Sequence, residues 1–295
     1  MTPPRLASFP AEVDQLEYSS RSIVFARSGA ELFRAWGAPG RSFVLGVEEA
    51  GARWRVRAWG ADPPAARRAV RDLFSLAHPL EEFYRLLGRE PVLKGTGQRF
   101  RGLRLPRDAS LFEALLHSVV GQQLSVAAAN TIKGRLIRLA QAYVEVEGME
   151  VPHCPTPAEL RALGPESLRS VGLSGAKTAS LLALAASHDA GRLASVRFAR
   201  GDREQAIDRL TEEKGVGRWT AENALLRGLG RRDLFIAGDL GVRNALDRFG
   251  AVPRSAPEDA ARAWAERHYP DWGSYATLYL WRRYVADARS SASAG

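Results

Sequence analysis

The spacing of hydrophobic residues changes near residue 75 and divides the chain into two regions. In the first region short apolar runs are separated by turn residues, and three runs predict β-strands: 22–25, 42–47 and 53–59. The third run alternates basic and apolar residues, which is the pattern of a half-buried strand. The segment 62–76, which opens with two prolines after Asp62, predicts a helix packed on the sheet. Residues 1–75 are therefore expected to form a small α+β domain.

Beyond about residue 80 the apolar spacing becomes that of helices. Apolar residues recur at intervals of three and four between Leu111 and Val120. The segment from Ala179 to Ser187 is apolar on nearly every side, which predicts a buried central helix. We therefore expect a mostly helical region over 76–289 and a disordered tail over 290–295, where the residues are small and polar. The fold class is α+β.

The composition is that of an ordinary soluble protein, with 45% hydrophobic and 25% charged residues. No apolar run approaches the roughly 20 residues that cross a bilayer, and no signal-peptide pattern is present, so we expect a cytoplasmic protein. Cys154 is the only cysteine, which excludes an internal disulfide and any zinc or iron–sulfur site made only of cysteines. The histidines are scattered without ligand spacing, so no transition metal is expected.

The formal net charge of +9 favours a polyanionic partner. All but four of the 42 basic residues are arginines, and their forked guanidinium groups suit phosphate. The same bias also arises from the base composition of a genome, so nucleic-acid binding needs support from a motif. A generic basic helical protein that binds nucleic acid through charge alone is one alternative.

A glycine turn between two helical segments is the first specific feature. Residues 206–210 have the spacing of a short helix, Gly215-Val216-Gly217 interrupts it, and a second helix resumes at Trp219. In such a turn, backbone N–H groups point outward together beside a helix N-terminus and bind a phosphate oxygen. Val216 is expected to pack between the two helices. Plain turns between helices also contain such glycines, so the motif needs a second feature to be specific.

The second feature is an aspartate downstream of the turn. The hairpin Gly215-Val216-Gly217-Arg218-Trp219-Thr220-Ala221, followed by Leu234-Phe235-Ile236-Ala237-Gly238-Asp239, resembles the signature of the helix-hairpin-helix DNA glycosylase superfamily. Within it the chain looks most like the AlkA group, the 3-methyladenine DNA glycosylase II enzymes. Further similar segments are 102–106, 120–127 and 272–281. The resemblance covers residues 75–285, and weakly the N-terminal sheet domain, and implies two helical lobes with the active-site cleft between them.

The resemblance assigns catalysis to Asp239. An aspartate before a helical segment is also a good N-cap, and the two roles are compatible because a helix N-terminus stabilises a charged carboxylate. Breaking an N-glycosidic bond develops positive charge on the sugar, which a nearby carboxylate stabilises while it orients the attacking water. Alkylated purines such as 3-methyladenine and 7-methylguanine already carry positive charge and leave without a general acid. A single catalytic carboxylate therefore fits alkylated bases.

Position 219 predicts that the strand itself stays intact. Relatives that also cleave the strand have a lysine there, whose amine attacks the sugar, whereas this chain has Trp219. Lys177 and Lys214 lie off that position, so a monofunctional enzyme of base excision repair that leaves an abasic site is expected. Two alternatives are a glycosylase for oxidised guanine and a non-catalytic protein that binds damaged DNA. Trp219 argues against the usual bifunctional form of the first, and Asp239 argues against the second.

The target base must leave the duplex to reach such a site. Gln122-Gln123-Leu124 lies at a helix break where the family inserts a side chain into the vacated stack; Gln123 is the expected plug and Leu124 the second candidate. The alternative for the glutamines is a solvated helix end. The hairpin residues expected to contact DNA are Lys214, Gly215, Val216, Gly217, Arg218 and Thr220. The family often has proline in place of Lys214, which is either a phosphate contact or a solvated helix end.

Aromatic rings are expected to receive the flipped base, because electron-rich rings attract a cationic base. The resemblance points to Trp281, Tyr275 and Trp219, of which Trp281 is the better candidate and Trp219 the more structural. Asn223 occupies a pocket position where the family can carry an aromatic residue, which implies a roomier or more polar pocket.

The resemblance implies no required cofactor. It implies a structural Na⁺ or K⁺ on the backbone carbonyls of Thr211, Glu213 and Val216. The expected partner is double-stranded DNA that contains a damaged base, with no membrane association. A monomer is expected, because no sustained heptad or exposed apolar stripe is evident.

Overall fold

The computed structural model describes Met1, Phe9 and residues 22–37 and 42–292, with side chains described as far as Ala288. Near the N-terminus four antiparallel strands form a sheet in chain order: β1 (Phe25–Ser28), β2 (Glu31–Trp36), β3 (Phe43–Ala50) and β4 (Arg53–Trp59). The predicted strand over 22–25 was mostly wrong, because Ser22–Val24 is a short 3-10 helix (η1) and β1 begins at Phe25. The predicted run 42–47 overlaps the first part of β3, and the predicted run 53–59 coincides with β4.

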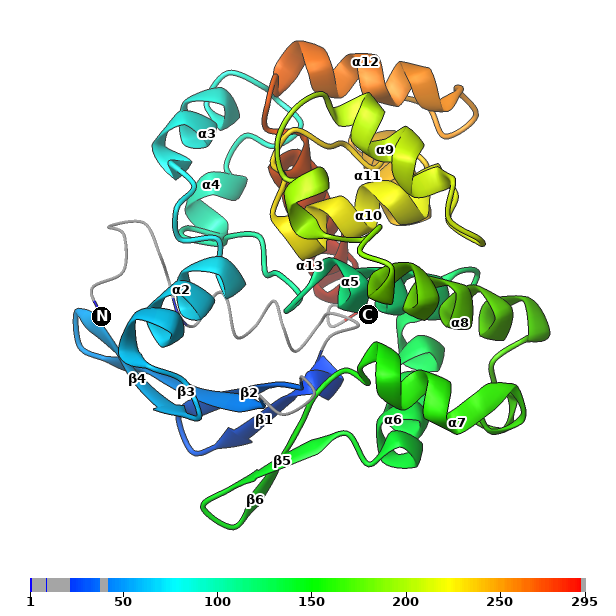
Figure 1. Cartoon of the computed structure of the whole chain (residues 1–295). Coiled ribbons are helices and arrows are strands. Elements are labelled where there is room, and N and C mark those ends of the chain that lie inside the picture. The colour runs from blue at the N-terminus through cyan, green and yellow to red at the C-terminus, as the bar shows by residue number, and fades with distance from the viewer. Residues whose placement is uncertain (2–8, 10–21, 38–41, 293–295) are drawn as a thin grey trace.

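The sheet is covered on both faces (Figure 1). Helix α2 (Pro63–Leu73) packs on one face through an apolar cluster that includes Trp54 and Val70, and its N-terminus is capped by the Asp62 carboxylate. It ends three residues before the predicted end at residue 76. A hairpin of β5 (Tyr143–Val146) and β6 (Met149–Pro152) covers the other face. The sequence patterns did not predict this hairpin.

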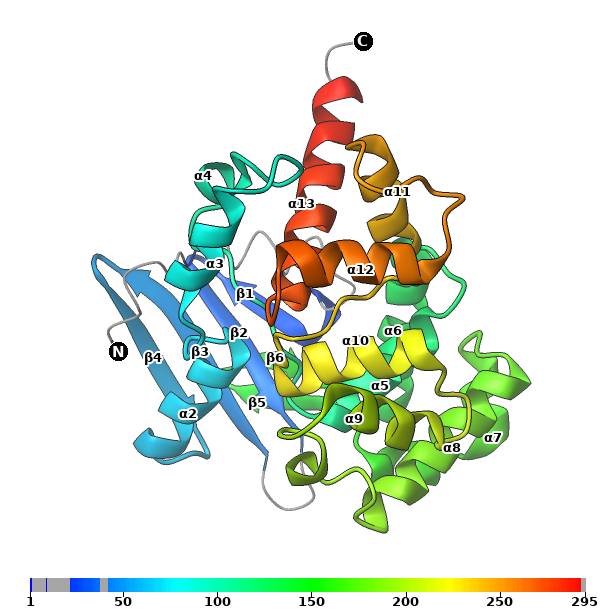
Figure 2. The same ribbon diagram turned by 90° about the horizontal axis from the view of Figure 1, so that it is seen from above.

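The rest of the described chain is helical, as expected. Its elements are α3 (Leu80–Leu87), α4 (Thr96–Arg99), α5 (Leu111–Gly121), α6 (Val126–Ala140), α7 (Pro157–Ser170), α8 (Gly175–Asp189), η2 (Ser195–Arg197), α9 (Arg203–Thr211), α10 (Arg218–Leu229), α11 (Leu240–Arg248), α12 (Glu258–His268) and α13 (Gly273–Ala292). Figure 2 shows α10 between α12 on one side and α9 on the other. None of the described helices is both long and apolar enough to span a membrane.

The buried central helix is α5 rather than α8. Every side chain from Leu111 to Val120 is buried in α5, whereas Ala186 in α8 is exposed. Alanine and serine dominate the segment 179–187, and these small residues do not reveal which side of a helix faces solvent. α5 and α10 approach closely, since a Cβ on Gly228 would lie 2.7 Å from the Cα of Leu111.

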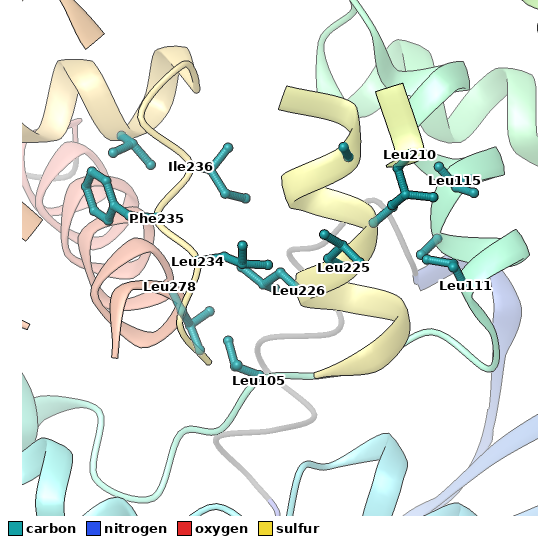
Figure 3. Packing of buried hydrophobic residues seen from close by; sticks show 14 of the residues in the cluster. Leu105, Leu111, Leu115, Leu210, Leu225, Leu226, Leu234, Phe235, Ile236 and Leu278 are labelled. Carbon is teal, nitrogen blue, oxygen red and sulfur yellow. The ribbon is translucent and has the colours of Figure 1, made fainter. Parts of the chain in front are cut away.

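One continuous core holds the helices that carry the candidate site (Figure 3). Leu225 and Leu226 of α10 are fully buried in it, and so is Ile236 of the segment that precedes α11. Burial of each such side chain stabilises the fold by about 2 kcal/mol. The positions of α10 and α11 relative to α13 are therefore set by packing.

The C-terminal end departs from the predicted tail over 290–295. Residues 290–292 belong to α13, because a run of serine and alanine contains no proline or glycine that would stop a helix. Residues 293–295 of the predicted tail lie outside the described residues.

Candidate active site

Asp239 is the N-cap of α11, as the helix pattern predicted. Its Oδ1 accepts a hydrogen bond from the backbone N–H of Val242 at 3.0 Å. The preceding residues, Leu234 to Ala237, are buried in the core and fix where α11 begins. The carboxylate is half-buried, so it combines a defined position with access from solvent.

Two indole groups from different helices converge on this carboxylate. Trp281 of α13 donates its Nε1–H to Oδ1 at 2.8 Å. Trp219 of α10 donates its Nε1–H to Oδ2 at 3.2 Å. Together with the Val242 amide, three donors orient the group and stabilise its negative charge. The sequence pointed to these rings as surfaces for a base, and their role as donors to Asp239 was missed because it depends on the packing of α10 against α13.

Space beside the carboxylate is preserved by Gly241. A Cβ at this position would lie 3.1 Å from Asp239 Oδ1 and 3.3 Å from the Trp281 ring. Such contacts are tighter than most real ones, so a side chain here would crowd the site. The side chain of Leu240, which lies between Asp239 and Gly241 in the sequence, is 58% exposed.

Asn223 lies on the face of α10 that carries Trp219 and Arg227. These residues are spaced by four, which places them in one row along the helix. The guanidinium of the buried Arg227 lies 5.4 Å from the centre of the Trp281 ring, while Trp219 bonds to Asp239. The row therefore faces the site. The Oδ1 atom of Asn223 is buried without a hydrogen-bond partner among the described residues.

Tyr275 is not brought to Asp239. It is fully buried, its hydroxyl bonds to Nδ1 of His78 at 2.9 Å, and its ring packs against Phe83 and Trp272. Six residues separate it from Trp281, which corresponds to a rotation of about 240° around a helix, so the two rings point to different sides of α13. The proposed base-pocket role of Tyr275 therefore has no geometric support.

Burial together with nearby guanidinium groups changes the acidity of His78. The pKa of this histidine is lowered to about 4, first by burial and then by the positive charges of Arg104, Arg107 and Arg232. His78 is therefore neutral near pH 7.

The hairpin between α9 and α10 has the geometry that its glycines predicted. Gly215 has φ +77°, and a Cβ there would lie 2.0 Å from Ser180 Oγ, so both backbone conformation and space require glycine. Val216 is 5% exposed and packs into the core. Gly217 is the exposed N-cap of α10, with open space around its Cα. The N-terminal amides of α10 therefore begin at an uncrowded surface.

The other hairpin residues differ in exposure. Lys214 is exposed, but the Arg218 guanidinium bonds to Glu204 and Glu222 at 2.9 and 3.0 Å. Thr220 is 2% exposed, and its hydroxyl accepts a hydrogen bond from Gln122. The side chains of Arg218 and Thr220 are thus engaged within the protein. Thr211 is exposed and Glu213 is half-buried, and the carbonyl of Glu213 accepts the Val216 amide at 3.1 Å.

The break between α5 and α6 separates the three residues of the expected insertion. Gln122 is half-buried, and its Nε2 donates to the carbonyl of Gly215 at 3.0 Å and to Thr220 Oγ1 at 2.9 Å. Gln123 is exposed with φ +56°, and Leu124 is 39% exposed. Gln123 and Leu124 therefore protrude, while Gln122 joins the break to the hairpin.

Lys177 was not predicted to belong to this region. Its Nζ donates to the carbonyls of Val120 and Gln122 at 2.8 and 2.7 Å. No local sequence signal indicates that these segments meet, because they are brought together only by the packing of α8 against α5.

Comparison with known proteins finds a family and several relatives that this chain resembles. The profile of the "HhH-GPD superfamily base excision DNA repair protein" family matches residues 116–270. A relative from Bacillus subtilis named DNA-3-methyladenine glycosylase is 28% identical over 72% of this chain and 70% of its own length.

Two solved structures have similar folds. A 3-methyladenine DNA-glycosylase from Archaeoglobus fulgidus has a TM-score of 0.84 at 23% identity and covers 96% of this chain and 97% of its own. A 3-methyladenine DNA glycosylase of Schizosaccharomyces pombe, solved in complex with abasic DNA, has a TM-score of 0.58 at 29% identity, covering 68% of this chain and 95% of its own. The family match includes the hairpin and Asp239, and the chain belongs to the HhH-GPD superfamily of base excision DNA repair proteins.

Proposed function

We propose that the protein is a monofunctional DNA glycosylase that removes alkylated purines, such as 3-methyladenine and 7-methylguanine, from double-stranded DNA. The observation that carries the proposal is the half-buried carboxylate of Asp239, held by two indole N–H groups and a helix N-terminus. The names of the similar proteins from B. subtilis and A. fulgidus support the choice of substrate.

The proposed role of Asp239 follows from the positive charge that develops on the sugar during bond cleavage. As the N-glycosidic bond lengthens, positive charge develops on C1′ and the ring oxygen of the sugar, and a fixed carboxylate stabilises it. Asp239 then orients the water that attacks C1′ and accepts its proton. The cationic base departs as a neutral molecule with the bonding electron pair, so no group has to protonate it. The surrounding donors hold Asp239 in place without reorganising during the reaction.

The residue at position 219 favours base release without strand cleavage. A lyase needs an amine that forms a Schiff base with C1′. Trp219 has no such amine, and its N–H group is occupied by Asp239. Lys177 is engaged with the carbonyls of Val120 and Gln122. An intact strand with an abasic site is the expected product.

DNA would be held by the hairpin and opened by the break between α5 and α6. The amides at the start of α10 offer donors to one phosphate, and the net charge of +9 adds attraction for the duplex. Gln123 and Leu124 protrude from the break and would fill the space of the flipped nucleotide. The solved complex of the S. pombe enzyme with abasic DNA supports DNA as the partner.

The flipped base would lie against Trp281. This ring is half-buried beside Asp239, and an electron-rich face attracts a cationic base. Arg227 is 5.4 Å from the same ring and reduces that attraction, while the Asn223 amide adds a hydrogen-bonding group. The pocket is thereby more polar than one lined by aromatic rings alone.

A monovalent cation at the hairpin is a separate part of the proposal. Carbonyl oxygens are suitable ligands for Na⁺ or K⁺. Thr211 is the last residue of α9, and Glu213 and Val216 lie in the turn between α9 and α10. The Glu213 carbonyl accepts one N–H and keeps a second lone pair. A bound ion would brace the turn and would take no part in bond cleavage.

The test uses end-labelled duplex DNA with one alkylated purine, incubated with the wild-type protein or with Asp239→Asn and then divided into alkali-treated and untreated halves. Strand breaks only after alkali, and only with the wild type, are expected. Breaks without alkali would disprove monofunctional action. An equal yield from Asp239→Asn would remove Asp239 from the mechanism, and the same assay with oxidised guanine tests the alternative substrate.

A further inference from the structure

Lys177 joins two elements that are distant in sequence. It lies in the first turn of α8, and its Nζ reaches the C-terminal end of α5, where it donates to the carbonyls of Val120 and Gln122. The last carbonyls of a helix have no partner within that helix, and a cation near them is favourable. The ammonium group therefore holds the backbone at the start of the α5–α6 break.

Gln122 extends this connection to the phosphate-binding hairpin. The Nζ of Lys177 donates to the backbone carbonyl of Gln122. The side-chain amide of Gln122 donates in turn to the Gly215 carbonyl and to the Thr220 hydroxyl. Gln122 is thus fixed at both ends. The insertion turn, residues 122–125, is consequently attached both to α8 and to the hairpin.

α8 also contacts the hairpin directly. Ser180 lies one turn after Lys177, and its Oγ occupies the space that a Cβ on Gly215 would need. The end of α5, the start of α8 and the hairpin are therefore in mutual contact through a small number of residues. Burial lowers the pKa of Lys177, in agreement with a partly desolvated ammonium group in this junction.

The backbone conformation of Gln123 shows why such a junction is needed. Its φ of +56° lies in the left-handed region, which is unfavourable for a residue with a Cβ. Neighbouring contacts must maintain this conformation, and the residue directly before it is the one that Lys177 and the hairpin hold. Released from these contacts, the turn would relax and Gln123 would no longer protrude in the same direction.

We propose that Lys177 is a positioning residue for base flipping, which fixes the insertion turn at a set distance from the phosphate-binding hairpin. The proposal rests on the proposed glycosylase function, since the turn acts only where a nucleotide is flipped. When the hairpin binds a phosphate, the rigid junction places Gln123 and Leu124 at the adjacent base step. Lys177 itself does not touch the reacting atoms.

The first test compares Lys177→Met with Lys177→Arg and with Lys94→Met, which removes an exposed lysine from the loop before α4. Hydrogen–deuterium exchange of residues 120–126 is measured in the DNA-free proteins. Lys177→Met should accelerate exchange there about tenfold, because two charge-assisted hydrogen bonds are lost. Lys177→Arg should show a smaller change and Lys94→Met none. Unchanged exchange in Lys177→Met would overturn the proposal.

The second test measures flipping on duplex DNA that has 2-aminopurine next to the lesion. Lys177→Met should lower the flipping rate and the single-turnover rate of base release at saturating DNA about tenfold, and Lys177→Arg should restore part of both. The pH profile of release should not change, because Asp239 is untouched. Equal losses in Lys94→Met would assign the effect to charge alone and contradict the proposal.

Two further outcomes are distinguishable. If Lys177→Met does not fold, Gln122→Met can be used, because it removes the side-chain hydrogen bonds between the insertion turn and the hairpin. A normal flipping rate in Gln122→Met would overturn the proposal. Neither exchange nor 2-aminopurine fluorescence requires bond cleavage. A wild-type protein that flips the base without releasing it would disprove the glycosylase function and leave the role of Lys177 in place.

Discussion

The indole N–H of Trp281 is directed at the carboxylate of Asp239, with a distance of 2.8 Å between Nε1 and Oδ1. The two residues are brought together from α13 and from the N-terminus of α11. In the proposed reaction the ring therefore has two tasks, because its face meets the base while its edge orients the acid. These tasks can be separated by substitution.

Trp281→Phe keeps an aromatic face and removes the donor. We expect the single-turnover rate of base release to fall about tenfold or more, as when one preorganised donor is lost, with little change in the affinity for lesion-containing DNA. Trp219→Phe should have a smaller effect, because its contact with Asp239 is longer, at 3.2 Å. Single-turnover assays and binding titrations check this. If Trp281→Phe lowers the affinity for lesion-containing DNA but leaves the single-turnover rate unchanged, Trp281 acts in binding alone.

Asn223→Leu is expected to raise stability and to change lesion preference. The buried Oδ1 has no partner among the described residues, and removing such a group should stabilise the fold by about 1 kcal/mol. The apolar replacement should also change the ratio of 3-methyladenine release to 7-methylguanine release, because a polar group in the row with Trp219 is lost. Thermal melting and competition between the two substrates provide the measurement. Identical preference in the variant would exclude Asn223 from base recognition.

Gly215→Ala should weaken DNA binding and destabilise the hairpin by about 2 kcal/mol, because the new Cβ adds a clash to a strained φ. Gly191→Ala is the matched control, since Gly191 also has positive φ, +71°, but a Cβ there would meet no other atom within 4 Å. The control isolates the cost of the backbone conformation. Combining Gly215→Ala with Ser180→Gly should recover part of the loss, as measured by melting and by titration with duplex DNA.

His78 makes stability depend on pH below neutrality. Its pKa in the folded protein is about 4, below the ordinary value of 6.5, so the unfolded chain binds the proton more readily. The stabilisation from neutral His78 is complete above pH 6.5 and is lost as the pH falls toward 4, at about 1.4 kcal/mol per pH unit. Denaturant unfolding of the wild type and His78→Gln should diverge in this window. Parallel curves would contradict the shift.

The features that were predicted correctly are those that a short segment of sequence determines by itself. The glycines of the hairpin and the position of Asp239 before α11 depend on backbone conformation and capping, which short segments encode. Strand β2 was not among the predicted runs, because Glu31 and Arg34 interrupt its apolar pattern. Both are buried in the structure, where they pair with Arg57 and Glu113.

The site residues that were missed or misplaced depend on long-range packing. The ring of Tyr275 was expected near the base, yet the rotation of α13 directs it toward His78. The contacts of Lys177 with α5 likewise follow from how α8 packs. Side-chain type identifies which residues can do chemistry, and tertiary packing decides which of them meet.

The β5–β6 hairpin packs across the boundary near residue 75 that the sequence pattern indicated. The N-terminal sheet has α2 on one face, but its other face is covered by the β5–β6 hairpin, which follows α6 in the chain. A fragment that ends at residue 75 would leave that face of the sheet exposed to water, and a fragment that begins there would expose Val146 and Val151. The two regions are therefore separable in sequence, but each buries apolar side chains of the other.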